Sequence, residues 1–143
     1  MRLSLRAIRS DPSCAEGYVA RGHCVYLMGD FNDALPLLRE AIRLDPDFGR
    51  AKKLLRQCRG VASDVKGARA FAFRRDFNSA VQSFTSALEA VDPLPRGAPL
   101  YCALHAERGE ALVRMGQWEK ALQDARMAIG GREDHAGAWL VKA

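Results

Sequence analysis

Ala7-Ile-Arg-Ser-Asp-Pro12 returns almost unchanged as Ala41-Ile-Arg-Leu-Asp-Pro46, which places the two copies 34 residues apart. A fixed period in this range marks stacked supersecondary units, and 34 residues is the length of a helix–turn–helix repeat. Proteins built from such repeats act by presenting surface to other molecules. The repeat therefore indicates a binding protein rather than an enzyme.

A second pattern marks one face of a helix in each repeat. An aromatic residue is followed by apolar residues at intervals of three, four and three, in three places: Phe31, Ala34, Leu38 and Ala41; Phe77, Ala80, Phe84 and Ala87; Trp118, Ala121, Ala125 and Ala128. These intervals put each set on one helical face, with small residues where another helix comes close. Each run is predicted to be the second helix of a pair.

The first helices carry paired glycines. Gly22 and Gly29 are seven residues apart, and so are Gly109 and Gly116. We expect the first glycine of each pair to let two helices pack closely, and the second to adopt the left-handed conformation that ends the helix.

These patterns predict an all-α chain. The expected segments are the second helix of a truncated repeat at 1–12, repeats at 13–48, 61–95 and 100–134, a connecting helix at 49–60, and the first helix of a truncated repeat at 135–143. Arg59-Gly60 is expected to bend the chain into a helix at about 63–74, and the Pro- and Gly-rich residues 92–99 are expected to form a loop.

The composition argues against several classes of protein. No apolar run approaches the roughly 18 residues that span a bilayer, so no membrane segment is expected. The four cysteines form no C-x-x-C pair and the three histidines are scattered, so no zinc site is expected. Reduced thiols fit a cytoplasmic or nuclear protein. The sequence has no phosphate loop and no G-x-S-x-G motif, and adjacent His23 and Cys24 diverge on a helix, so neither cofactor nor catalysis is expected.

The repeated helix patterns of this chain resemble those of the tetratricopeptide repeat (TPR) family. The family pattern includes a glycine between aromatic residues in the first helix and a terminal Asp-Pro. A narrower resemblance is to the TPR region of DnaJ-type (J-domain) co-chaperones, and it is carried by residues 11–26, 66–71 and 100–102. The resemblance implies a right-handed α-α solenoid that binds partner proteins, among them the seventy- and ninety-kilodalton heat-shock chaperones. The chain has no His-Pro-Asp signature, so the ATPase-stimulating activity of a J domain is not expected in it.

The resemblance also implies a clamp for the acidic C-terminal tails of chaperones, formed by Lys, Asn and Arg side chains. In this chain the glycine of the pattern is present as Gly67, but none of the five polar clamp positions holds the expected residue: they are Asp64, Ala68, Glu107, Gly137 and Val141. A second carboxylate near Glu107 would be repelled. We therefore predict that the groove of residues 61–143 does not bind acidic chaperone tails by the usual clamp.

Helical geometry predicts a mostly apolar inner face that lines a peptide groove. The candidates are Val19, His23, Tyr26, Phe71, Phe73, Ala106, Glu107, Glu110, Leu140 and Val141. Such a face suits an amphipathic helix or a hydrophobic segment of a partner. The same residues are also expected if they simply pack against a neighbouring repeat.

Residues 50–75 are strongly basic, with Asp64 as the single acid, and the whole chain carries a net charge of +5. The basic-surface candidates are Arg50, Lys52, Lys53, Arg56 and Arg59. Such a surface suits an acidic protein or a nucleic acid, or it is a solvated helix face. No aromatic stacking pattern accompanies the charges, which argues against single-strand binding.

The leading interpretation is therefore a non-catalytic protein-interaction scaffold of TPR type, derived from a J-domain-type co-chaperone. The alternatives are a TPR adaptor of an unrelated complex, a basic repeat protein associated with nucleic acid, and a gene fragment without function.

Overall fold

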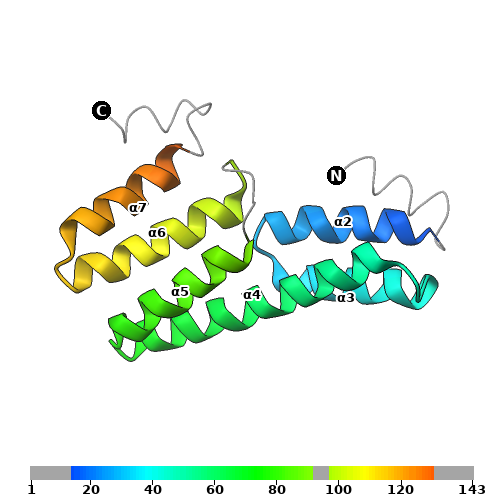
Figure 1. The fold of residues 1–143 in the computed structure, drawn as a ribbon, viewed down its shortest axis with the longest axis horizontal. Helices are drawn as coiled ribbons and strands as arrows, with labels where there is room; N and C mark the ends of the chain where they lie inside the picture. Colours follow the sequence, from blue (N-terminus) through cyan, green and yellow to red (C-terminus); the bar gives the residue numbers. More distant parts are fainter. Residues whose placement is uncertain (1–13, 92–96, 131–143) are drawn as a thin grey trace. The chain divides into compact units, whose positions relative to one another are not determined.

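The computed structural model describes residues 14–91 and 97–130. Its regular elements there are helices: α2 (Ala15–Leu27), α3 (Phe31–Leu44), α4 (Gly49–Phe73), α5 (Phe77–Val91), α6 (Pro99–Arg114) and α7 (Trp118–Gly130) (Figure 1). The predicted all-α class is confirmed. The terminal half-repeats expected at 1–12 and 135–143 lie outside the described residues, as does most of the loop expected at 92–99. None of the helices described is both long and apolar enough to cross a membrane.

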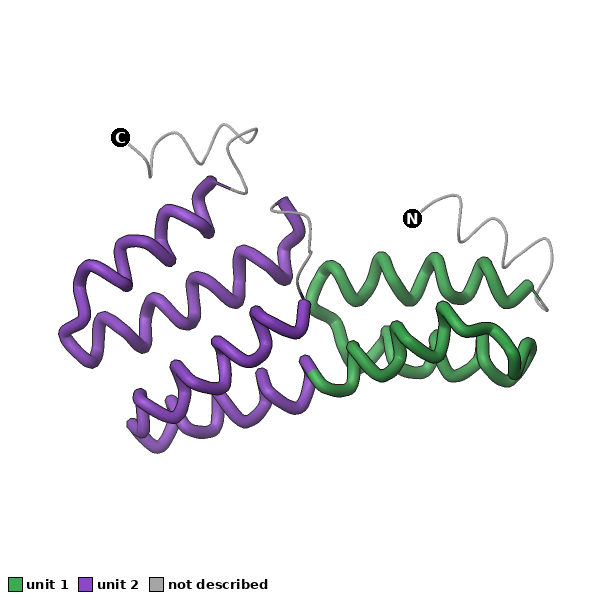
Figure 2. The backbone as a smooth tube through the Cα atoms, in the orientation of Figure 1, with its two compact units in different colours: residues 1–60 green, residues 61–143 purple. Residues whose placement is uncertain are grey.

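The chain divides into two compact units, residues 1–60 and 61–143 (Figure 2). In unit 1, α2 and α3 form a helical hairpin, and the start of α4 packs on it. The buried cluster contains one residue from each of these three helices, Val19, Ala41 and Ala51. An ideal Cβ on Gly22 would lie 2.9 Å from Leu38 Cδ2, so the expected close approach of α2 and α3 is present.

Unit 2 contains the rest of α4 together with α5, α6 and α7. Neighbouring helices pack as α5 on α6 and α6 on α7. The predicted face of α5 is buried, since Ala80 and Ala87 are fully inaccessible and Phe84 is 2% exposed. The prediction was wrong for most of the α7 face: Ala121 is 6% exposed, but Trp118 is 66% exposed and Ala125 is also exposed. An ideal Cβ on Gly109 would lie 3.2 Å from the Cβ of Asp124, so α6 and α7 are also held close by a glycine.

The same turn ends α2, α4 and α6. The residue at its centre has a left-handed backbone: Gly29 at φ 85°, Arg75 at φ 64° and Gly116 at φ 76°. Each turn closes with two backbone hydrogen bonds of the Schellman type; after α4 these are Arg75 N–H to the Ala72 carbonyl (3.0 Å) and Asp76 N–H to the Phe71 carbonyl (2.8 Å). The predicted role of the two glycines is confirmed.

Arg75 is the exception among these turns. A left-handed backbone costs a residue with a side chain about 1–2 kcal/mol. A cation near a helix C-terminus recovers about 0.3–1 kcal/mol from the helix dipole, which is less than this cost.

The expected bend at Arg59-Gly60 was wrong, because α4 is continuous from Gly49 to Phe73. Gly60 is exposed and a Cβ there would meet nothing within 4 Å, so glycine serves no packing purpose at this point. A glycine inside a helix costs only about 0.5–1 kcal/mol relative to alanine. Cys58 and Val61, on either side, are fully buried and favour the helical conformation through packing. The expected connecting helix at 49–60 is therefore the first half of α4.

Candidate partner-binding cleft

Unit 2 contains a cleft of about 470 Å³ between the first helices of its two hairpins. Residues from α4, α5, α6 and the α4–α5 turn line it: Arg69, Ala72, Phe73, Arg75, Phe77, Phe84, Glu107, Glu110, Ala111 and Arg114. The lining thus combines aromatic rings with charges of both signs.

A bidentate ion pair joins α4 to α6 in this lining. Arg69 donates from Nε to Glu107 Oε2 (3.0 Å) and from Nη2 to Glu107 Oε1 (2.8 Å). The hydrogen bond to Glu107 raises the pKa of Arg69 above its ordinary value. Because the two side chains are 60% and 31% exposed, the pair contributes only about 0.2–1 kcal/mol to stability. Its main effect is to balance the negative charge of Glu107, for which the sequence alone indicated no partner.

The apolar part of the lining is open to solvent at Phe73. This ring belongs to the last residue of α4 and is 91% exposed. The other two aromatic residues of the lining are less accessible, since Phe77 is half-buried and Phe84 is buried. An exposed aromatic side chain beside a cleft is the kind of group that anchors a partner.

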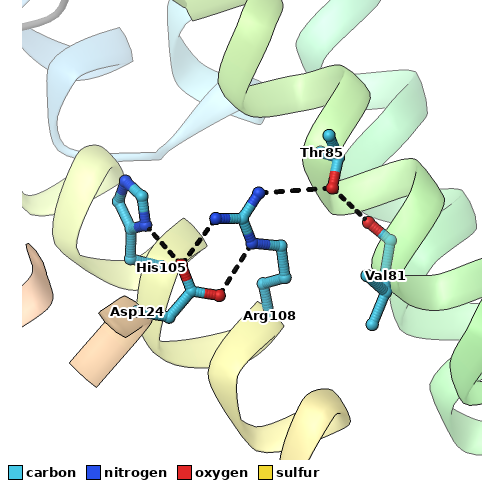
Figure 3. A network of polar contacts seen from close by, with 5 residues as sticks. All are labelled: Val81, Thr85, His105, Arg108 and Asp124. Carbon is cyan, nitrogen blue, oxygen red and sulfur yellow. Dashed lines mark hydrogen bonds and ion pairs between the residues drawn. The ribbon is translucent and has the colours of Figure 1, made fainter. Parts of the chain in front are cut away.

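A partly buried polar network ties α5, α6 and α7 together (Figure 3). Asp124 Oδ1 lies 3.0 Å from His105 Nδ1, and Arg108 donates from Nε to Asp124 Oδ2 at 2.7 Å and from Nη2 to Oδ1 at 2.5 Å. Arg108 Nη1 also donates to Thr85 Oγ1 (3.2 Å), whose hydroxyl donates to the Val81 carbonyl (2.8 Å). Burial alone would raise the pKa of Asp124, but the hydrogen bonds from Arg108 and His105 hold it below its ordinary value.

The network joins three helices of unit 2 through side-chain hydrogen bonds. Its histidine faces a carboxylate that an arginine already neutralises, and the residues that the structure describes contain no cluster of ligands that could hold a metal ion. An ionised carboxylate only accepts hydrogen bonds, so Nδ1 of His105 is the donor.

The groove candidates of unit 1 are placed differently from the prediction. Val19 and Tyr26 are each 1% exposed, because Val19 packs with Ala41 of α3 and Ala51 of α4, and Tyr26 lies beside the ring of Phe31 at the start of α3. Neither side chain offers a surface to a peptide. His23 is half-buried, and burial together with the nearby charge of Arg50 lowers its pKa.

The groove candidates of unit 2 are partly brought together. Phe73, Glu107 and Glu110 line the cleft, whereas the half-buried Phe71 and the exposed Ala106 are not part of its lining. Leu140 and Val141 lie outside the described residues. Three arginines of the lining, Arg69, Arg75 and Arg114, were not among the predicted groove residues. One signal was present in the sequence, since Arg75 occupies the position that Gly29 and Gly116 occupy in the other repeats.

The five basic-surface candidates are all exposed on the first half of α4, at Arg50, Lys52, Lys53, Arg56 and Arg59. None of them has an ion-pair partner within residues 14–91 and 97–130. They form an open basic face in unit 1, separate from the residues that line the cleft.

Comparison with known proteins supports the repeat assignment. Residues 15–48 match the family model of the tetratricopeptide repeat. The chain is 28% identical over 122 residues to the DnaJ homolog subfamily C member 7 homolog of Schizosaccharomyces pombe. It is 24% identical over 136 residues to the protein of that name in Dictyostelium discoideum, and 27% identical over 139 residues to DnaJ homolog subfamily C member 7 of Mus musculus.

These alignments cover 85%, 95% and 95% of the chain, and 25%, 25% and 27% of the respective relatives. The chain thus spans about a quarter of the length of the curated relatives it matches. The predicted resemblance to TPR proteins, and within them to DnaJ-type proteins, is confirmed. The repeats and relatives support a TPR scaffold of co-chaperone type and point away from catalysis.

Proposed function

We propose that this chain is part of a DnaJ-type co-chaperone and that its unit 2 cleft binds a segment of a partner protein. The observation that carries the proposal is Phe73, a 91% exposed aromatic side chain at the edge of a cleft of about 470 Å³. The chain acts as a scaffold without catalysis or cofactor. Its four free cysteines suit the reducing cytoplasm or nucleus.

The cleft differs from a clamp for acidic chaperone tails. Asp64 accepts a hydrogen bond from Ser86 Oγ (3.0 Å), Ala68 is fully buried, and Glu107 is held by Arg69. These clamp positions give a terminal carboxylate no free donor. We therefore expect a synthetic acidic tail with a free C-terminus to show no saturable micromolar binding, and a heat-shock chaperone that binds this chain would do so through another segment.

Selection from a library of displayed protein segments tests the proposal. Segments enriched on the native chain should bind Phe73→Ala about tenfold more weakly, since aromatic side chains at the edge of a pocket carry much of an interface's binding energy. Met28→Ala is the matched control, because Met28 is 60% exposed on unit 1. Both variants should have the same unfolding temperature as the native chain. Full binding by Phe73→Ala, or an equal loss in Met28→Ala, would contradict the assignment of the site.

A second candidate function rests on the unpaired basic face of α4 in unit 1. It suits an acidic protein partner better than a nucleic acid, because the described residues of unit 1 include no exposed aromatic side chain beside the charges. Binding of single- or double-stranded nucleic acid with a steep loss of affinity in salt would favour the nucleic-acid alternative instead.

A further inference from the structure

In the turn after α4, an arginine has the left-handed backbone conformation that a glycine has in the equivalent turns after α2 and α6. Arg75 has φ 64°, while Gly29 and Gly116 have φ 85° and 76°. The two backbone hydrogen bonds of the turn are the same in all three places, so the turn itself needs no side chain at this point. Backbone strain of this kind clusters at functional sites, where the surrounding structure holds the strained residue in place.

The side chain of Arg75 lines the cleft together with Arg114, the last residue of α6. Among the described residues, neither arginine has an ion-pair partner, whereas Arg69 is held by Glu107. Glu110 is the other carboxylate of the lining. Once the Arg69–Glu107 pair is set aside, two guanidinium groups remain against one carboxylate. The surplus charge of the cleft is therefore positive.

We propose that Arg75 and Arg114 bind an internal aspartate or glutamate of the partner segment, while Phe73 packs against a large apolar residue beside that acid. The proposal rests on the proposed function, because it names the partner chemistry of the same cleft. A guanidinium group binds a carboxylate through two parallel hydrogen bonds, which makes arginine suited to this task. The acid is internal because the clamp positions that would hold a terminal carboxylate have no free donor.

The test uses short random segments displayed between two constant domains, so that no segment has a free C-terminus. The native chain, Arg75→Gly, Arg114→Gln and Phe73→Ala are compared. Arg74→Gln is the matched control, because Arg74 is an exposed neighbour that does not line the cleft. Each enriched segment is also made with its acidic residues replaced by the corresponding amides.

Segments enriched on the native chain should contain an acid next to a large apolar residue. Arg75→Gly and Arg114→Gln should each weaken their binding about tenfold. The amide versions should bind the native chain, Arg75→Gly and Arg114→Gln equally. Arg75→Gly should also raise the unfolding temperature, so that affinity and stability move in opposite directions.

Enrichment without acids overturns the inference, and so does a loss in Arg74→Gln equal to that in Arg75→Gly. If Phe73→Ala loses binding while Arg75→Gly and Arg114→Gln do not, the cleft binds the partner but the acidic preference is refuted. If Phe73→Ala binds as the native chain does, the proposed function itself fails.

Discussion

Replacing Asp124 with asparagine should destabilise unit 2 by more than the loss of any surface ion pair. The Asp124 side chain is 4% exposed and accepts from Arg108 and His105. Asparagine keeps one acceptor oxygen but loses the second and the charge, which leaves a desolvated guanidinium without a counter-ion. Breaking a fully buried pair costs about 3–5 kcal/mol, and because the Arg108 side chain is 22% exposed we expect about 2–3 kcal/mol.

Urea unfolding followed by far-ultraviolet circular dichroism measures this loss directly. The midpoint should fall while the slope stays constant, because the surface exposed on unfolding is unchanged. Glu107→Gln is the control, since it removes an ion pair whose partners are 60% and 31% exposed and should cost about 1 kcal/mol at most. Equal midpoints for Asp124→Asn and Glu107→Gln would refute the reasoning that burial makes the Asp124 network strong.

The acid side of the stability curve provides an independent check. The pKa of Asp124 in the folded chain lies below its ordinary value of 3.8, so the unfolded chain takes up the proton first as the pH falls. The contribution of Asp124 is therefore complete above that ordinary value and is lost as the pH falls through the folded pKa. The stability difference between the native chain and Asp124→Asn should be constant at neutral pH and should shrink only in this acid range.

Three further predictions concern other parts of the chain. Gly22→Ala should destabilise unit 1 by about 1–2 kcal/mol, because its new methyl group would lie 2.9 Å from a buried side chain of α3. Gly60→Ala, whose methyl group would meet nothing within 4 Å, should stabilise α4 by about 0.5–1 kcal/mol, and thermal unfolding distinguishes the two outcomes. Glu107→Gln should lose its small effect in high salt, which unfolding at two ionic strengths checks. Burial raises the pKa of the Cys58 thiol to about 11, so iodoacetamide should label the half-buried Cys24 in the folded chain and leave Cys58 unlabelled until urea is added, as judged by peptide mass spectrometry.

The repeat pattern was sufficient to predict the hairpins. Local properties determine a helix face, a close approach at Gly22 and a left-handed residue at Gly29, and these are readable from spacing alone. The continuity of α4 was missed because Arg59-Gly60 permits a bend without requiring one. The choice was made by burial of Cys58 and Val61, which depends on the fold.

The site was less accessible to sequence reasoning. Periodicity identified the face of α2 that carries Val19 and Tyr26, but it does not say which helix covers that face. The pair between Arg69 and Glu107 joins residues 38 positions apart, and the pair between His105 and Asp124 joins residues 19 apart. Contacts at such separations depend on how helices pack and on side-chain direction, and a single sequence contains no periodic signal for them.

The glycines at the helix crossings also bear on how this protein can change over evolutionary time. Gly22 and Gly109 put a hydrogen atom where first and second helices meet, while the equivalent position of α4 is the fully buried Ala68, with a methyl group. A hydrogen atom or a methyl group at this one position thus affects how closely the two helices of a hairpin can approach. Because a repeat contacts only its neighbours, that spacing can change in one hairpin while the others keep theirs. An array of nearly identical hairpins can in this way adapt the width of its binding surface by single substitutions, without redesign of the fold.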